Sequence, residues 1–419
     1  MRAMTKPALL ILFGWLMLAV APTAHARDLA IVGAKIYPSP DTPSVAKGTV
    51  LIRGGRIVAV GAVEEIRVPG RAEVIDGEGL VVVAGFWNSH VHLLPVPLRE
   101  ASSRTASELS AALEAMCTRW GFTTVFDIGS LHGNAIALRR RVERGEIIGP
   151  KILTTDALFF PENGTPFYVR ELFQQLDVPS MEVASAKQAR RRAREQLAEG
   201  ADGIKLMTGS IVGGKIDVLP MDLGIASALV REGRRAHKPV FAHPTNQTGL
   251  DIAIASGVDV LAHTTPTIGA WPPELVARLL RADMALIPTL SLFEDLLTRE
   301  GAPPDVLQRY RDAAQQQLGA FSKAGGQVLF GTDVGFIELA DTHLEYRLMA
   351  GAGLSWQQIL ASLTTNPAKR FGYAQHKGRI AQDMDADLVV LNRDPARDPE
   401  AFADVKYTIR DGKLVYAAK

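Results

Sequence analysis

The chain is poor in cysteine and in net charge, and each shortage excludes a class of protein. Cys117 is the only cysteine among 419 residues, so neither an intramolecular disulfide nor a cluster of thiolate metal ligands can form. The formal net charge is +1, and loss of the first 26 residues with Arg2 and Lys6 would leave 44 basic against 45 acidic side chains. This balance provides no electrostatic surface for nucleic acid or an anionic membrane, so we expect neither as a partner.

Long apolar runs are also scarce, and the most prominent one lies at the N-terminus. Arg2 and Lys6 precede an apolar stretch at residues 8–20, and residues 24–26 fit a small-x-small cleavage site. The stretch is short for a membrane span, although an uncleaved anchor is the alternative. We therefore expect a signal peptide over residues 1–26 and a periplasmic or secreted mature chain without membrane attachment.

Length and composition indicate one large α/β domain with a smaller β-rich companion. A chain with 47% hydrophobic and 22% charged residues has room for a barrel and an appendage. Residues 27–83 and 373–419 contain short strand-like runs and hairpin-like stretches at 48–60 and 407–416. Residues 84–372 alternate strand-like and helix-like runs, with one helix expected over 222–237. The expected fold is therefore α/β, a (β/α)8 TIM-like barrel with a small β-sandwich built from both termini.

Metal-binding residue types stand at the ends of several strand-like runs of the middle region. The runs cover residues 80–89, 203–204, 239–242, 258–262 and 328–332, and they lead in turn to His90 and His92, Lys205, His243, His263 and Asp333. The spacing assigns these residues to strands one, four, five, six and eight of the barrel. Because the carboxyl ends of the strands form one mouth, where such barrels carry their chemistry, we expect the side chains to meet there.

These residue types suit divalent cations. His90 and His92 are two apart on a strand, so both imidazoles point to one face and can share an ion. Lysine is an unusual ligand, but burial lowers its pKa, and a neutral amine can capture carbon dioxide as a carbamate that bridges two metals. The alternative for Lys205 is an ordinary ion pair with a carboxylate.

The motifs resemble the amidohydrolase superfamily, in particular the branch related to imidazolonepropionase and to binuclear, prolidase-like dipeptidases. The resemblance covers nearly all of the mature chain and is carried by residues 85–92, 201–207, 242–243, 261–264 and 331–333, with further likeness at 363–368 and 378–391.

The resemblance implies a hydrolytic site with two divalent metal ions, zinc being the expected metal, and with carbon dioxide bound as the N6-carboxylate of Lys205. By this carry-over one ion is held by His90, His92, Lys205 and Asp333, and the other by Lys205, His243 and His263. A hydroxide between the ions would be the nucleophile. Asp333 would take its proton and deliver it to the leaving group.

Two further histidines are candidate substrate contacts. His132 follows the second predicted strand. His343 follows the eighth, where it could orient Asp333 or pack within a helix.

The substrate is less well defined than the chemistry. Dipeptidase-like relatives carry a Gly-Gly-His run and a tyrosine in two loops where this chain has residues 161–165 and 213–220 without them. We expect a small-molecule amide or dipeptide-like substrate. A lactonase or ester hydrolase, a mononuclear deaminase or cyclic-amide hydrolase, and a non-catalytic periplasmic binding protein are the alternatives. The sequence leaves open whether the chain forms a homo-oligomer.

Overall fold

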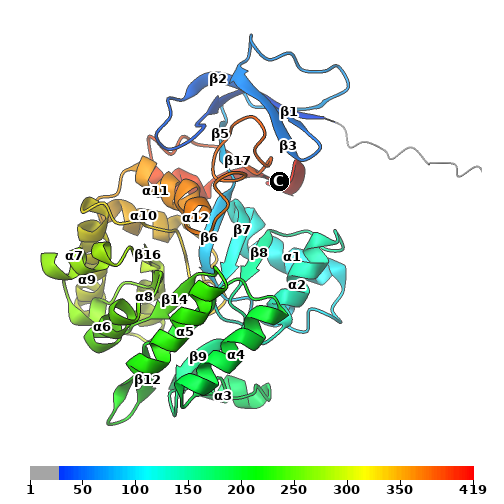
Figure 1. Ribbon diagram of the computed structural model, residues 1–419. Coiled ribbons are helices and arrows are strands. Elements are labelled where there is room, and N and C mark those ends of the chain that lie inside the picture. Colours follow the sequence, from blue (N-terminus) through cyan, green and yellow to red (C-terminus); the bar gives the residue numbers. More distant parts are fainter. Residues whose placement is uncertain (1–27) are drawn as a thin grey trace, which may run out of the picture.

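The computed structural model describes residues 28–419, so the predicted signal peptide lies outside the described residues. Within residues 28–419, no helix is both long and apolar enough to cross a membrane. Figure 1 shows a small β domain above a larger α/β domain. This architecture confirms the expected fold class, a TIM-like barrel with an additional β-sandwich domain.

The small domain is one eight-stranded sheet that both ends of the chain build together. Its strands follow the order β19-β18-β17-β5-β1-β2-β3, with β4 paired to β1. The bounds are β1 (Leu29–Ile36), β2 (Val45–Arg53), β3 (Arg56–Ala62), β4 (Glu73–Asp76), β5 (Val81–Ala84), β17 (Leu388–Leu391), β18 (Val405–Arg410) and β19 (Lys413–Ala417). The hairpins β2–β3 and β18–β19 lie where the sequence predicts hairpins. The central pair β5 and β17 runs antiparallel and joins the two ends, with Val83 opposite Val389.

The barrel of the large domain begins directly after this sheet. Its parallel strands are β6 (Phe86–Val91), β7 (Phe122–Asp127), β8 (Lys151–Thr154), β9 (Leu158–Pro161), β11 (Ile204–Met207), β14 (Val240–His243), β15 (Val260–Ala262) and β16 (Ala285–Ile287). The third strand is divided, since β8 pairs with β7 and β9 pairs with β11. Residues 328–334 take the eighth position, where Val328 bridges to Leu286 and Val334 bridges to Val91. The barrel therefore closes between β16 and β6.

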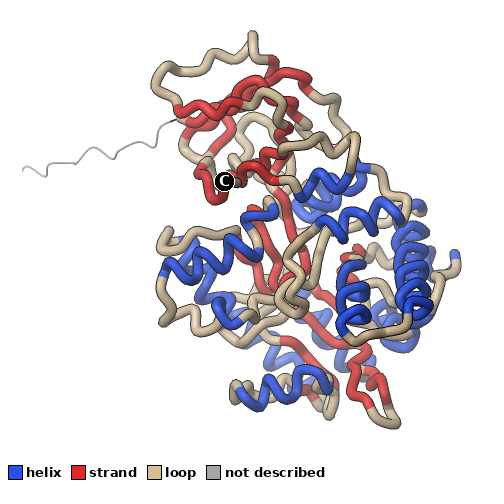
Figure 2. The backbone as a smooth tube through the Cα atoms, turned by 180° about the vertical axis from the view of Figure 1, so that it is seen from behind, coloured by secondary structure: helices blue, strands red, loops and turns tan. Residues whose placement is uncertain are grey.

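Helices cover the outside of the barrel, and Figure 2 shows them around the strands from behind. They are α1 (Ala106–Met116), α2 (Asn134–Glu143), α3 (Phe167–Gln175), α4 (Ala186–Glu199), α5 (Leu223–Arg235), α6 (Gln247–Ser256), α7 (Pro273–Arg281), α8 (Leu290–Arg299), α9 (Pro304–Lys323), α10 (His343–Gly351), α11 (Trp356–Leu363) and α12 (Thr365–Arg370). Short elements lie between them, namely β10 (Glu182–Val183) and the hairpin β12 (Gly209–Gly213) and β13 (Asp217–Pro220). The α5 helix follows the sequence prediction, because the Asp222 side chain caps it by accepting from Ile225 N at 3.0 Å.

One predicted strand is divided in the structure. The apolar run at 80–89 forms two strands that belong to different domains, β5 in the small sheet and β6 in the barrel. The division falls at Gly85, whose amide donates to Asp387 O in the small domain at 2.8 Å. A Cβ at this position would overlap the side chain of Thr123, so only glycine allows the chain to pass between the two domains here. The hydrophobicity of the sequence alone does not show where an apolar run passes from one sheet into another.

Candidate metal centre

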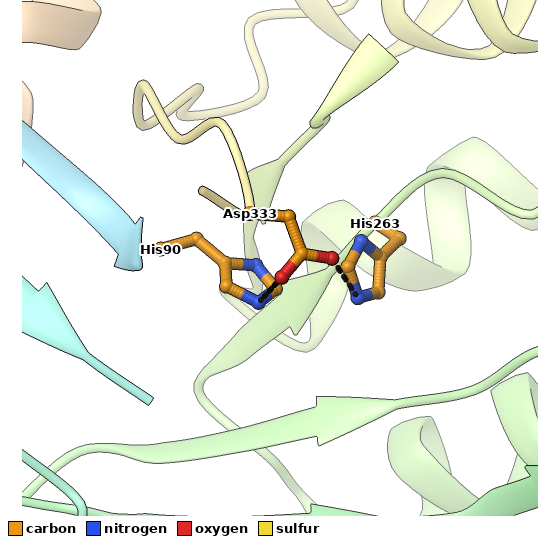
Figure 3. A group of neighbouring side chains, drawn as sticks. All are labelled: His90, His263 and Asp333. Atoms are coloured by element: carbon orange, nitrogen blue, oxygen red, sulfur yellow. Dashed lines mark ion pairs between the residues drawn. The ribbon is translucent and has the colours of Figure 1, made fainter. Parts of the chain in front are cut away.

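The six predicted ligands come together at the carboxyl ends of the barrel strands. His90 lies in β6 and His92 just after it, Lys205 lies within β11, and His243 ends β14. His263 follows β15 directly, and Asp333 lies in the eighth segment. Figure 3 shows His90, His263 and Asp333 directed toward one another from three different parts of the barrel. The sequence-based expectation of one shared mouth therefore agrees with the geometry.

Asp333 is the centre of the cluster. Its Oδ1 atom lies 3.2 Å from His90 Nε2 and 2.9 Å from His92 Nε2, and its Oδ2 atom lies 3.8 Å from His263 Nε2. The Asp333 backbone has φ of 63° and the His263 backbone has φ of 77°. Such left-handed conformations are uncommon for residues other than glycine, and here they turn both side chains toward the cluster.

His243 joins the cluster through His263. The two ring centroids are 4.6 Å apart, the same separation as that between His263 and His90. His263 thus lies between the His90–His92–Asp333 group and His243. His90, His263 and Asp333 also form a group of potential ligands, whose ligating atoms all lie within 4.8 Å of one another.

Hydrogen bonds behind two of the histidines determine which ring nitrogen faces the cluster. His92 Nδ1 lies 2.5 Å from Gly129 O, and a carbonyl can only accept, so Nδ1 carries the proton. His263 Nδ1 lies 2.6 Å from Thr289 Oγ1. That hydroxyl donates to Pro288 O at 2.8 Å, so it accepts from His263 Nδ1. Both rings therefore turn Nε2 into the cluster, the orientation that histidine metal ligands use. Burial lowers the pKa of His263 well below its usual value, whereas at His92 burial is outweighed by the hydrogen bond to Asp333 and by the charge of Asp333, which raise the pKa.

The same geometry is unfavourable without a cation. The Nε2 atoms of His90 and His92 approach to 3.2 Å, and Asp333 Oδ1 is buried with no hydrogen-bond partner in the described part of the chain. Three potential ligand atoms thus converge on one point. Burial, together with the charge of Lys205, lowers the pKa of His90 and of His243 to about 3, so these rings are neutral. Neutral imidazoles and a carboxylate suit a borderline cation such as zinc, so the residues present fit a divalent ion.

Asp333 carries the negative charge of the cluster. Burial opposes ionisation of this carboxyl, but the imidazoles of His90 and His92 outweigh burial and hold its pKa well below the usual range. An ionised carboxylate beside these imidazoles is a ligand for a cation and also a group that can accept a proton.

Lys205 is the unusual member of the set. Its side chain is 2% exposed, and among residues 28–419 the structure records neither a hydrogen bond nor an ion pair for its amine. Burial lowers the pKa of Lys205 to about 7, and the charge of Asp333 opposes this change only partly. The alternative of an ordinary carboxylate partner is therefore not what the structure contains. A substantial part of the amine is neutral near pH 7, the form that reacts with carbon dioxide.

The two candidate substrate histidines lie among other partners. His132 Nδ1 approaches Asp156 Oδ2 at 2.5 Å and His132 Nε2 approaches Glu199 Oε2 at 3.4 Å. His343 begins α10, where its ring contacts Asp341 at 2.7 Å and Asp404 at 3.5 Å. The structure therefore does not bring either ring into the six-residue cluster, and His343 does not orient Asp333 by contact.

Sequence reasoning did not single out several residues that border the cluster. Thr289 ends the predicted seventh strand, so its position was a usable signal. Tyr168 and Phe336 carried none. Their ring centroids lie 5.3 Å apart, and Phe336 lies 6.4 Å from the His92 ring. Burial and the negative charge of Asp333 raise the pKa of Tyr168, which places this partly exposed phenol near the mouth.

Comparison with known proteins shows the family to which this chain belongs. The family model described as the amidohydrolase family matches residues 81–415, which is most of the chain. The chain belongs to the amidohydrolase family. It is therefore a hydrolase that acts on carbon–nitrogen bonds, and the superfamily expected from the sequence is confirmed.

Individual relatives of this amidohydrolase are distant in sequence and similar in fold. It is 22% identical to ochratoxinase from Aspergillus niger over 95% of this chain and 88% of that enzyme. The ochratoxinase crystal structure superposes with a TM-score of 0.75 at 19% identity, covering 94% of this chain and 96% of that chain. A Xaa-Pro dipeptidase with bound methionine gives a TM-score of 0.79 at 20% identity over 93% and 100% of the two chains. Molinate hydrolase gives 0.75 at 22% identity over 93% and 95%.

Proposed function

We propose that this amidohydrolase is exported and cleaves an amide bond of a small molecule with two divalent metal ions, zinc being the expected metal. The observation that carries the proposal is Lys205, a buried amine without a carboxylate partner among residues 28–419, in a cluster with four histidine imidazoles and one aspartate. A lysine in this setting is unfavourable as an ammonium, and its N6-carboxylate would turn it into a ligand. The N-terminal 26 residues support export by their signal-peptide pattern.

The residues divide into two ligand groups. His90, His92 and Asp333 would hold one ion, since their ligating atoms converge within 3.2 Å of one another. His243 and His263 would hold the other, and carboxylated Lys205 would bridge the two. When bound, the two ions would polarise the scissile carbonyl and lower the pKa of water from about 15.7 to about 7.

Asp333 is the proton carrier in this proposal. Its carboxylate is ionised and faces the interior of the mouth, so it can take the proton of the attacking water. It would then deliver that proton to the nitrogen of the departing amine, which leaves as a neutral product. His92 and His263 keep their Nδ1 protons on Gly129 O and Thr289 Oγ1, so these two rings do not act as acids.

The relatives favour an amide over an ester substrate. Proteins of similar fold are named for the hydrolysis of Xaa-Pro dipeptides and of molinate, and an ochratoxinase is similar over nearly the whole chain. A lactonase or ester hydrolase remains the second candidate, since the same ligands would activate either carbonyl. The family membership makes the chain an enzyme, which removes the non-catalytic binding protein.

Metal analysis combined with a substrate panel tests the proposal. We expect about two zinc equivalents per chain in the purified protein, and loss of turnover after chelation that zinc with bicarbonate restores. The panel compares N-acyl amino acids, dipeptides and lactones that share the same acyl group. One metal per chain would indicate the mononuclear alternative, and preferential turnover of lactones would indicate the esterase alternative.

The Lys205→Ala variant provides the matched control for the bridge. We expect it to lose the second metal equivalent and to recover part of its activity with small carboxylic acids, which can replace the missing carbamate. Retention of two equivalents without any added acid would contradict the role of Lys205.

A further inference from the structure

Thr289 binds the His263 ring through its hydroxyl, and the same hydroxyl is therefore not used to cap the helix that Thr289 precedes. Thr289 is fully buried and occupies the N-cap position of α8, where a threonine hydroxyl normally accepts a hydrogen bond from the first turn of the helix. Here its side chain makes no such capping bond. Its hydroxyl instead donates to Pro288 O and accepts from His263 Nδ1. The left-handed backbone of Thr289, with φ of 44°, accompanies this orientation.

Glu345 provides the missing cap from another helix. Its side chain is fully buried on α10, and its two carboxylate oxygens accept from the first amides of α8. The distances are 3.0 Å from Leu290 N and 2.7 Å from Ser291 N. A carboxylate at a helix N-terminus is favourable because it meets unpaired N–H groups and the positive end of the helix dipole. Glu345 therefore occupies the Ser291 amide, which the Thr289 side chain could otherwise cap, and Leu292 N already donates to Thr289 O at 3.2 Å.

We propose that Glu345 is a positioning residue for His263, because it caps α8 in place of Thr289 and leaves the Thr289 hydroxyl to fix the His263 ring. The chain of contacts runs from Glu345 through the first turn of α8 to Thr289 and then to His263 Nδ1. It keeps the His263 Nε2 atom unprotonated and directed at Asp333. The effect of these contacts on metal binding rests on the proposed function. The contacts themselves do not depend on it.

Replacement of Glu345 by glutamine removes one of the two acceptor oxygens that cap α8 and keeps the volume of the side chain. Glutamine has one acceptor oxygen, so its NH2 group would face the N–H of Leu290 or Ser291. With the NH2 group facing Ser291 N, Thr289 would turn toward α8 to satisfy that amide, and His263 would lose the acceptor for its Nδ1 proton. Changes of this kind behind a metal ligand reduce metal affinity about 10- to 100-fold, and we expect a loss in this range.

A double-mutant cycle tests the pathway through Thr289. Zinc affinity is measured on metal-stripped protein by competition with a chromogenic chelator, for wild type, Glu345→Gln, Thr289→Val and the double variant. If Glu345 acts through Thr289, the double variant binds zinc no more weakly than Thr289→Val alone. Multiplication of the two effects, or unchanged affinity in Glu345→Gln, would overturn the proposal. Thr289→Ser retains the hydroxyl and should bind zinc as the wild type does.

Ser355→Ala is the control for loss of a helix cap in general. Ser355 is exposed and caps α11 by accepting from Gln358 N at 3.3 Å. Its loss should lower the melting temperature and leave zinc affinity unchanged. Should Glu345→Gln not fold, Glu345→Asp retains the charge with a shorter reach and takes its place in the cycle.

A second readout is independent of metal and therefore of the proposed function. Nitrogen-15 NMR of histidine-labelled, metal-free protein reports the tautomer of each ring, and a His263→Gln variant assigns the signal. We expect the Nδ1–H form for His263 in wild type and Ser355→Ala, and a mixture of both tautomers in Glu345→Gln. A His263 signal identical in wild type and Glu345→Gln would refute the relay, whereas absence of zinc binding with this tautomer shift would refute only the metal centre.

Discussion

Replacement of Lys205 by methionine should stabilise the metal-free protein, although it removes the residue on which the proposed centre depends. The folded-state pKa of Lys205 is about 7, against 10.5 for an unhindered lysine. Because the folded protein binds fewer protons than the unfolded chain between these values, its stability rises with pH across this window. Each pH unit corresponds to about 1.36 kcal/mol, so burial of the amine costs the folded state about 4 kcal/mol at pH 7 and about 2 kcal/mol at pH 9.

Methionine has a similar shape without a titrating group, so the Lys205→Met variant avoids this cost at every pH. The measurement is urea unfolding of both proteins at pH 7 and pH 9, after removal of metal and in buffers free of carbon dioxide. The free energy of unfolding of Lys205→Met should exceed that of the wild type, and the difference should shrink by about 2 kcal/mol between the two pH values. A packing difference between the side chains adds a constant and leaves this change intact.

A difference of the same size at pH 7 and pH 9 would refute the reasoning, because it would mean that Lys205 keeps its charge in the folded state. Zinc with bicarbonate should reverse the order of stability. The wild type gains binding energy through both ligand groups, whereas Lys205→Met lacks the bridge. If the variant responded to zinc as strongly as the wild type, the lysine would have no part in binding the metal.

Three further predictions follow from the geometry. Asp333→Asn should lower kcat roughly 100-fold or more, since asparagine cannot carry the proton; full turnover in a steady-state assay would show that another group does so. Gly335→Ala should destabilise the protein by more than about 1 kcal/mol in thermal unfolding, because Gly335 has φ of 99° and a Cβ there would overlap His92 O; an unchanged melting temperature would contradict the close approach. Tyr168→Ala should raise KM about 5-fold for substrates with an aromatic group and leave kcat unchanged, while aliphatic analogues serve as the control; equal effects on both would exclude a ring contact at the mouth.

The barrel could be predicted from the sequence because its strands are buried on both faces. Such strands appear as uninterrupted apolar runs, and the intervals between runs match the length of a strand followed by a helix. The elements at the mouth were not predictable in the same way. The β12–β13 hairpin covers residues that read as a polar loop, since its strands project from the barrel and bury little apolar surface. Short exposed pairs of this kind depend on their neighbours more than on their own composition.

The candidate ligands could be found because each follows a recognisable run, but their supports could not. Glu345 and Leu290 are 55 positions apart, and nothing in the sequence relates a carboxylate on one helix to the first turn of another. His132 and His343, predicted as substrate contacts, lie outside the cluster for the converse reason. The side chain of a histidine near a strand end can point in several directions. Here the His132 ring contacts Asp156 and the His343 ring contacts Asp404, both outside the cluster.

Strained backbone conformations mark the candidate metal centre independently of which side chains could bind a metal. Among residues 28–419, most residues other than glycine with positive φ are aspartate or asparagine, which tolerate the left-handed region. The exceptions are Glu100, His237, Thr245, His263 and Thr289. Three of these lie at the cluster, since His263 is a predicted ligand, Thr245 is two residues after His243, and Thr289 holds His263. A β-branched residue in this region, such as Thr245 or Thr289, is a genuine outlier. Strain of this kind persists where the surrounding structure compensates it. Binding of a cation to the converging ligand atoms, as proposed above, would provide such compensation.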